Sequence, residues 1–287
     1  MLAEILPPEV AAVEAFGDVL DVELFPEEEA ALGRAVDKRR REFTTARACA
    51  RAALAKLGLP PVPIVPGLRG APQWPHDVVG SITHCIGYRA AAVARGHDIR
   101  TLGLDAEPDE GLPEGVVNRV AAADERAGLR ALASATPGPC WDRLLFSAKE
   151  SIYKAWFPLT RRWLGFEDTV ITINPVNGTF TVRLLVPGPV LDGRSLTRFE
   201  GRWLVRDGLV LTAIAVPALP QLCHRLCLAW RPLPAQPATL MRVAGDGGHQ
   251  APTACTPPST CTISPVVAGN QSDSSATHAR IWQLSDG

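Results

Sequence analysis

Two acidic residues lie two positions apart at the end of an apolar segment. Asp105 and Glu107 close residues 102–107, which otherwise hold only Leu, Gly and Ala. Residues at positions i and i+2 of a strand project from the same face, so both carboxylates should point to one side. A third acid, Glu150, comes later in the chain, and Lys154 follows it one helical turn on. These residue types could act together on an anionic substrate.

Three carboxylates without a histidine or cysteine beside them favour a hard cation. Asp105, Glu107 and Glu150 offer only oxygen ligands, which suit Mg²⁺ or Mn²⁺ better than zinc. Lys154 adds a point charge of the kind that binds phosphate. Taken singly, each half has a plain alternative, because strand-end acids are often solvated and Glu150 with Lys154 could be an ordinary i, i+4 surface pair. The combination predicts magnesium-assisted phosphate chemistry.

Two motifs contain these residues. The first is Gly-Leu-Asp-Ala-Glu at 103–107, and the second is Phe-Ser-Ala-Lys-Glu-Ser-Ile-Tyr-Lys at 146–154. Together they resemble the double signature of the Sfp-type 4′-phosphopantetheinyl transferases, G-[IVL]-D-x-E followed by [FW]-[SCT]-x-K-E-[AS]-x-x-K. Leu104 and Ser151 are conservative variants within this pattern.

Further segments resemble the family in the same order along the chain. Residues 81–87 are similar to its S-x-[ST]-H-x-x-G turn, and residues 38–58 are similar to its upstream basic helix. Trp141 and residues 155–160 resemble the actinobacterial branch, which serves large modular polyketide and nonribosomal peptide synthases. The resemblance covers about residues 5–216.

The resemblance implies an enzyme that transfers 4′-phosphopantetheine from coenzyme A to a serine of an acyl or peptidyl carrier protein. It would assign Asp105, Glu107 and Glu150 to Mg²⁺, and Lys154 to the leaving phosphate of 3′,5′-ADP. Candidates for contacts with coenzyme A are Arg39, Arg47, Arg69, His84, Lys149 and Lys154. The serine proton would pass to Glu150 directly or through a water on the metal, and the sequence does not choose between these routes.

Two other functions fit parts of the pattern. The first is another Mg²⁺-dependent phosphotransferase or phosphatase that uses ATP, although the chain has no G-x-x-x-x-G-K-[ST] loop. The second is a non-catalytic module that binds coenzyme A or carrier proteins. The acid triad with Lys154 disfavours it, since a pure binder needs no metal cage.

The clearest expected helix covers residues 34–57, with an apolar stripe that runs from Phe43 to Leu57. Arg47 flanks this stripe, so it should lie at the rim of the packed face, either as a solvated edge or as an anion seat. The helical wheel does not place Arg39 at this rim. Arg39 would therefore have to lie at or before the start of the helix.

Periodicity and turn residues predict the remaining elements. Helices are expected at 8–20, 114–133 and 141–157, and strands at 78–83, 88–95, 99–104, 169–173, 180–186, 195–205 and 209–216. This order predicts an α+β fold of two pseudo-symmetric halves, 1–104 and 105–216. The acidic strand end would lie at their junction, where ligand clefts are common.

Composition narrows the remaining possibilities. A net charge of −1 argues against a nucleic-acid partner. No run is long enough to span a membrane, and the first residues do not resemble a signal peptide. Seven scattered cysteines without paired metal spacing predict free thiols in a cytoplasmic protein. The protein is also expected to be a monomer. Residues 217–287 are rich in Pro, Ser, Thr and Ala, and they are predicted to form a disordered tail.

Overall fold

The computed structural model describes residues 1–191 and 193–218. The expected tail, 217–287, lies outside the described residues except for its first two positions. These two continue the fold, because Pro217 closes the last strand and the Ala218 N–H donates to the Asp98 carbonyl at 2.8 Å. The last strand therefore extends beyond the expected limit at residue 216.

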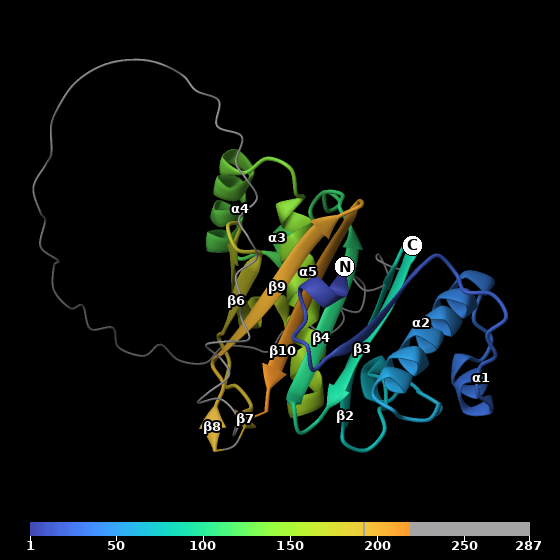
Figure 1. The fold of residues 1–287 in the computed structure, drawn as a ribbon. Coiled ribbons are helices and arrows are strands. Elements are labelled where there is room, and N and C mark those ends of the chain that lie inside the picture. Colours follow the sequence, from blue (N-terminus) through green and yellow to red (C-terminus); the bar gives the residue numbers. More distant parts are fainter. Residues whose placement is uncertain (192, 219–287) are drawn as a thin grey trace, which may run out of the picture.

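The first half is built on a three-stranded antiparallel sheet of order β1-β3-β2. Its strands are β1 (Ala11–Phe16), β2 (Val78–Cys85) and β3 (Tyr88–Arg95), and its helices are α1 (Pro26–Leu32) and α2 (Asp37–Lys56), with short 3₁₀ turns η1 (Leu2–Glu4) and η2 (Leu68–Gly70). The long helix α2 packs on the face of this sheet and buries the stripe predicted for it. Figure 1 shows α1 beside α2 at one end of the molecule.

The helix expected at residues 8–20 is wrong, because this segment forms strand β1. Ala11, Val13 and Ala15 pack toward α2, whereas Val10 and Ala12 pack on the opposite side of the sheet. That alternation has the period of a strand. Pairing with β3 from Ala11↔Val93 to Phe16↔Tyr88 outweighs the high helical propensity of the alanines.

The second half is built on a five-stranded antiparallel sheet of order β4-β10-β9-β6-β5. Its strands are β4 (Ile99–Pro108), β5 (Thr169–Asn174), β6 (Thr179–Leu184), β9 (Arg198–Arg206) and β10 (Leu209–Pro217), with a small ribbon of β7 (Val190–Leu191) and β8 (Arg194–Ser195). Its helices are α3 (Val116–Val120), α4 (Ala123–Ala135) and α5 (Trp141–Thr160), with the 3₁₀ turn η3 (Phe166–Asp168). The single helix expected at 114–133 is therefore divided at Ala121.

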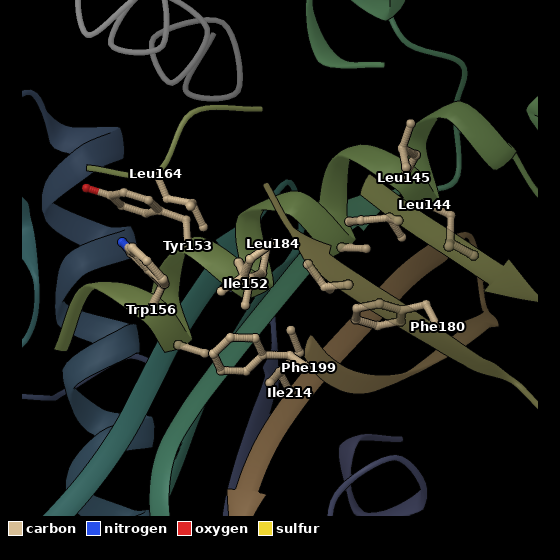
Figure 2. Close-up of a cluster of buried hydrophobic side chains, with 14 of the residues drawn as sticks. Leu144, Leu145, Ile152, Tyr153, Trp156, Leu164, Phe180, Leu184, Phe199 and Ile214 are labelled. Carbon is tan, nitrogen blue, oxygen red and sulfur yellow. The ribbon is translucent and has the colours of Figure 1, made fainter. Parts of the chain in front are cut away.

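Helix α5 buries its apolar side against the second sheet (Figure 2). Leu145, Ile152 and Trp156 lie on this side of the helix, as the sequence predicts, and they face sheet residues such as Phe180 and Ile214. The central position of β10 is also confirmed, because it pairs with β4 on one side and β9 on the other. The mixed helices and sheets confirm the α+β class.

The two sheets meet edge to edge where β2 runs beside β4. No backbone ladder joins these strands, and two side-chain hydroxyls bridge them instead. The Leu104 N–H donates to Ser81 Oγ, and the Ala106 N–H donates to Thr83 Oγ1, both at 3.0 Å. Strand β4 lies as a whole in the second sheet. The expected division after residue 104 falls inside this strand, so the boundary between the sheets lies before Ile99.

The two halves repeat one buried device. In the first half, Glu28 of α1 accepts from the Phe25 N–H, the Arg51 guanidinium and the Ile64 N–H. In the second half, a corresponding acid of α4 makes the same set of bonds. Glu125 accepts from the Ala122 N–H, Lys149 Nζ and the Ile171 N–H. Each acid joins a short helix, a long helix and the following segment, which supports the pseudo-twofold relation.

Candidate active site

A cavity of about 840 Å³ opens at the junction of the halves. Helix α2, the η2 turn and β2 line it from the first half, and β4 and α5 line it from the second. Its walls include every predicted site residue except Lys149: Arg39, Arg47, Arg69, His84, Asp105, Glu107, Glu150 and Lys154. Residues far apart in the chain therefore share one cavity.

The acidic wall comes from β4 and α5, which approach each other closely at Gly103. A Cβ atom at this position would lie 2.0 Å from the Ser151 carbonyl oxygen, so only glycine fits. This contact places the end of β4 next to the part of α5 that contains Glu150. Asp105, Glu107 and Glu150 are each about 95 % buried and line the same cavity.

Two of the acids are paired with basic residues. Lys154 Nζ donates to Asp105 Oδ1 at 2.7 Å, and Arg143 Nη1 donates to Glu107 Oε2 at 2.9 Å. Thr83 Oγ1 lies 3.4 Å from the same Asp105 oxygen. The other oxygen, Asp105 Oδ2, is buried without a hydrogen-bond partner among the described residues.

The crowding of the acids is visible in the pKa of Glu107. Burial and, secondly, the charge of Asp105 raise this pKa to about 8, although Arg143 and Lys154 oppose the shift. A carboxylate beside other carboxylates in a low-dielectric wall is stabilised by any further positive charge. This wall is therefore suited to a cation.

The donor set fits Mg²⁺ in its chemistry, since it offers carboxylate oxygens, among them Asp105 Oδ2, which has no hydrogen-bond partner within the part of the chain that the structure describes. The side chains are not already gathered as a cage. Within residues 1–191 and 193–218, no group of three His, Cys, Asp or Glu side chains stands close enough to hold a metal ion. The ion pairs with Lys154 and Arg143 use oxygens that a metal would otherwise take.

The basic wall begins with Arg39 and His84. Arg39 lies in the first turn of α2, because the helix starts at Asp37 and not at residue 34. Its Nη1 lies 3.0 Å from His84 Nε2. Burial, followed by the charges of Arg39 and Lys154, lowers the pKa of His84 to about 3, so the ring is neutral near neutral pH. Glu42 lies 3.9 Å from the other ring nitrogen.

Arg47 is buried in the same wall. Its Nε donates to the Ile64 carbonyl at 2.9 Å, and its guanidinium lies over the Phe43 ring, 3.7 Å from the centroid. Burial lowers the pKa of Arg47 to about 10, and Arg39 adds to this effect. Arg47 therefore still carries a positive charge at neutral pH. The plain alternative of a solvated edge does not hold for this arginine.

Arg69 also lines the cavity, in the η2 turn. Its backbone is left-handed, with φ of 54°, and its guanidinium lies 4.9 Å from the centroid of the Trp163 ring. The side chain is exposed, unlike that of Arg47. The cavity thus has one exposed cationic side chain, Arg69, and one buried cationic side chain, Arg47.

Lys149 does not reach the cavity. Its Nζ donates to Glu125, to the Phe166 carbonyl and to the Thr169 carbonyl, at 2.9, 2.7 and 3.0 Å. The side chain is 2 % exposed, so neither a phosphate contact nor a helix-surface charge describes it. Lys149 is the counterpart of Arg51 in the repeated device, and its role is to join α5 to α4 and β5.

Sequence reasoning missed Arg143 and Thr83. Arg143 lies seven residues before Glu150 on α5, which is two helical turns and therefore the same face. That spacing was available as a signal. Thr83 belongs to the segment that suggested His84, but nothing in its residue type shows that its hydroxyl bridges two sheets.

Comparisons with known proteins agree with this architecture. The family described as the 4′-phosphopantetheinyl transferase N-terminal domain matches residues 27–94, and the 4′-phosphopantetheinyl transferase superfamily matches residues 101–206. The interval between the matches contains the start of β4, at Ile99. The first match thus covers β2 and β3 of the first sheet, and the second covers most of β4 together with β5, β6 and β9 of the second sheet.

Three relatives are similar over most of their length. The 4′-phosphopantetheinyl transferase Svp of Streptomyces mobaraensis is 56% identical over 221 residues, which are 76% of this chain and 90% of that protein. Npt of Nocardia iowensis is 52% identical over 75% of this chain and 99% of its own. PptT of Mycobacterium tuberculosis is 48% identical over 75% of this chain and 98% of its own.

The chain belongs to the 4′-phosphopantetheinyl transferase superfamily, in its Sfp-type actinobacterial branch. It is an enzyme of this type, and the family uses coenzyme A as substrate. The two alternatives, an ATP-dependent phosphotransferase and a non-catalytic binding module, are therefore set aside. Among the helices that the structure describes, none is both long and apolar enough to cross a membrane.

Proposed function

We propose that this enzyme transfers the 4′-phosphopantetheine group of coenzyme A to a serine of acyl or peptidyl carrier proteins, with Mg²⁺ as cofactor. The observation that supports this most strongly is that one cavity is lined both by the three carboxylates and by several basic side chains. Coenzyme A has a pyrophosphate and a 3′-phosphate. It therefore requires several cationic contacts, and a cavity of this size can enclose part of such a ligand.

The reaction exchanges one phosphoester bond for another. The serine oxygen bonds to the phosphorus next to pantetheine, and the bond from that phosphorus to the bridging oxygen breaks. The electron pair stays with 3′,5′-ADP, and the serine loses its proton. Lys154, held at the cavity by Asp105, is placed to stabilise the charge that develops on the leaving phosphate. Glu150 is a buried carboxylate of the same wall that can accept the proton.

Asp105, Glu107 and Glu150 would hold the metal. When bound, Mg²⁺ supplies positive charge to the pyrophosphate oxygens. The chain contributes the positions of the three acids, which the contact between β4 and α5 at Gly103 determines. Lys154 and Arg143 remain in reach of Asp105 and Glu107 and can exchange these partners for phosphate oxygens.

The adenosine phosphates would be bound by Arg39, Arg47 and His84. These side chains come from neighbouring elements, α2 and β2, and they line one part of the cavity. Arg69, on the η2 turn, would add a contact at the rim. Lys149 is not included, because its ammonium group is enclosed by Glu125 and two carbonyls.

Incubation with coenzyme A, Mg²⁺ and a panel of apo-carrier proteins tests this proposal. Intact-mass measurement should show a gain of one phosphopantetheine group on at least one carrier, lost when its acceptor serine is changed to alanine. The panel should pair acyl and peptidyl carriers from modular synthases. If no carrier gains mass while the enzyme still binds coenzyme A, the proposed acceptor class is wrong.

We also propose that the enzyme acts as a cytoplasmic monomer. Cys49, Cys85 and Cys140, the cysteines within residues 1–218 for which a state is described, are all free thiols, as suits a reducing compartment. Size-exclusion chromatography with light scattering tests the monomer, and fractionation of the producing cells tests the compartment.

A further inference from the structure

Glu28 is a buried acid outside the cavity, and neither the metal nor the phosphates require it. Its side chain is fully buried, and its two oxygens accept four hydrogen bonds. Arg51 balances its charge at 2.8 Å, and Arg51 does not line the cavity. The shortest of the backbone bonds comes from the Ile64 N–H, at 2.8 Å.

The contacts of Glu28 lead on to the cavity through one residue. Ile64 is fully buried, and its N–H is bound by Glu28 while its carbonyl oxygen accepts from Arg47 Nε at 2.9 Å. Both polar groups of the Ile64 backbone are therefore in use. A peptide segment held in this way presents its carbonyl at a fixed place and in a fixed direction.

The bond from Ile64 determines which part of Arg47 remains available. It occupies Nε, and the Phe43 ring covers the flat face of the guanidinium. Arg47 lines the cavity, and its terminal nitrogens have no hydrogen-bond partner in the described part of the chain. Two parallel N–H groups are thus presented for an anionic ligand, in the geometry that binds phosphate best.

We infer that Glu28 is a positioning residue for coenzyme A binding, which acts through the Ile64 backbone on the orientation of Arg47. The inference rests on the proposed role of Arg47 at the phosphates. Glu28 does not touch the ligand. It lowers the entropy that Arg47 must lose on binding, because the guanidinium is already held in one orientation by Ile64 and Phe43.

The second half supplies a matched control. Glu125 is buried to a similar degree and makes the same bonds to a helix N-terminus, a basic side chain and an isoleucine N–H. Ile171, however, lies in β5 and pairs with Val182 of β6. The bond from its N–H to Glu125 therefore leads into the second sheet and not to a residue that lines the cavity. A general loss of stability should follow from changing either acid, whereas a loss of ligand affinity should follow only from changing Glu28.

The test is a double-mutant cycle on the full chain, with coenzyme A binding measured by isothermal titration calorimetry. Glu28→Gln should raise the Kd for coenzyme A by about three- to tenfold, which corresponds to the net contribution of one ordinary hydrogen bond. In the Arg47→Ala background, Glu28→Gln should cause no further change. Glu125→Gln should leave the Kd within about twofold of the wild type. In turnover assays, Glu28→Gln should raise KM for coenzyme A and leave kcat unchanged.

The possible results distinguish a failure of this inference from a failure of the proposed function. If Arg47→Ala leaves the affinity unchanged, the phosphate role of Arg47 and the inference both fail. If Arg47→Ala weakens binding but Glu28→Gln does not, or if their effects add, the inference alone fails. Should Glu28→Gln not fold, Glu28→Asp keeps the charge beside Arg51 but is too short to reach the Ile64 N–H, and the same cycle applies to it.

Discussion

At the scale of single residues, charge balance explains most of the candidate site. Asp105 has one oxygen in an ion pair with Lys154, and its second oxygen is buried without a hydrogen-bond partner among the residues described. Such an oxygen is costly in a folded protein unless a ligand uses it. Glu107 is in a comparable position, because its pKa is raised to about 8 by burial and by Asp105. Both acids therefore gain from a cation.

The first prediction concerns the Asp105 carboxylate. Asp105→Asn should lower kcat/KM for transfer by at least about 10²-fold, because it removes a negative charge at the centre of the reaction. The thermal midpoint should change little, since the variant loses the pair with Lys154 but also the repulsion from Glu107. Steady-state kinetics and calorimetric unfolding check the two parts. Near-normal activity at saturating Mg²⁺ would show that Asp105 is not a metal ligand.

The second prediction concerns His84 and pH. The pKa of this residue is lowered to about 3 in the folded enzyme by burial first and then by Arg39, whereas an unfolded chain has a histidine pKa of about 6.5. As pH falls below about 6.5, His84 becomes protonated in the unfolded state, whereas in the folded state it stays neutral down to about pH 3. The stability contributed by neutral His84 is therefore present above the unfolded pKa and is lost as pH falls through this window.

Replacing His84 with glutamine removes the titrating group. Urea unfolding between pH 7.5 and 5 should show a smaller loss of stability for His84→Gln than for the wild type. His97 offers a control, since its side chain is mostly exposed and lies away from the cavity. An equal pH dependence in the wild type and in His84→Gln would mean that His84 is not held neutral.

At the scale of elements, local patterns succeeded where one element buries one face. The α2 and α5 helices and the strands around the Asp105 motif are confirmed, because each has a clear apolar period. The helix expected at 8–20 is wrong because β1 forms a strand by pairing with β3. The residues of this segment alone do not indicate that a strand distant in sequence pairs with them. The contact of Lys149 with Glu125 could not be predicted for the same reason, because it joins two segments that are distant in sequence.

The third prediction tests the contact between β4 and α5. Gly103→Ala should destabilise the enzyme by about 1–3 kcal/mol or more, because the new methyl group meets the Ser151 carbonyl and forces the strand from the helix. Activity should fall as well, since this contact places Asp105 beside Glu150. Gly128→Ala is the control. Gly128 lies inside α4 with open space at its Cβ, so alanine there should stabilise the protein by about 0.5–1 kcal/mol. A neutral Gly103→Ala would mean that the two elements are not in close contact.

At the scale of the whole molecule, the site exists only where the halves meet. Neither sheet alone contains both the basic wall and the acidic wall, and the hydroxyls of Ser81 and Thr83 join the edges of the two sheets beside Asp105. The motifs allowed the site residues and the α+β class to be predicted. The motifs could not show that the hydroxyls of Ser81 and Thr83 join the two halves, or that Lys149 pairs with Glu125 and not with a ligand. Those facts depend on packing between distant segments.

The last prediction concerns where the folded body ends. All the residues that line the cavity lie between Arg39 and Arg161, and the superfamily match ends at residue 206. A chain cut after Ala218 should therefore keep full transfer activity.

A cut after Val216 should be less stable, because it removes Pro217, which pairs with Ile99, and the bond from the Ala218 N–H to Asp98. Strand β10 is central in its sheet, so damage at its end should spread to β4 and to the acids on it. Comparison of the 1–216, 1–218 and full chains by thermal unfolding and by carrier-protein labelling checks both parts. An inactive or insoluble 1–218 chain would show that residues 219–287 contribute to the body.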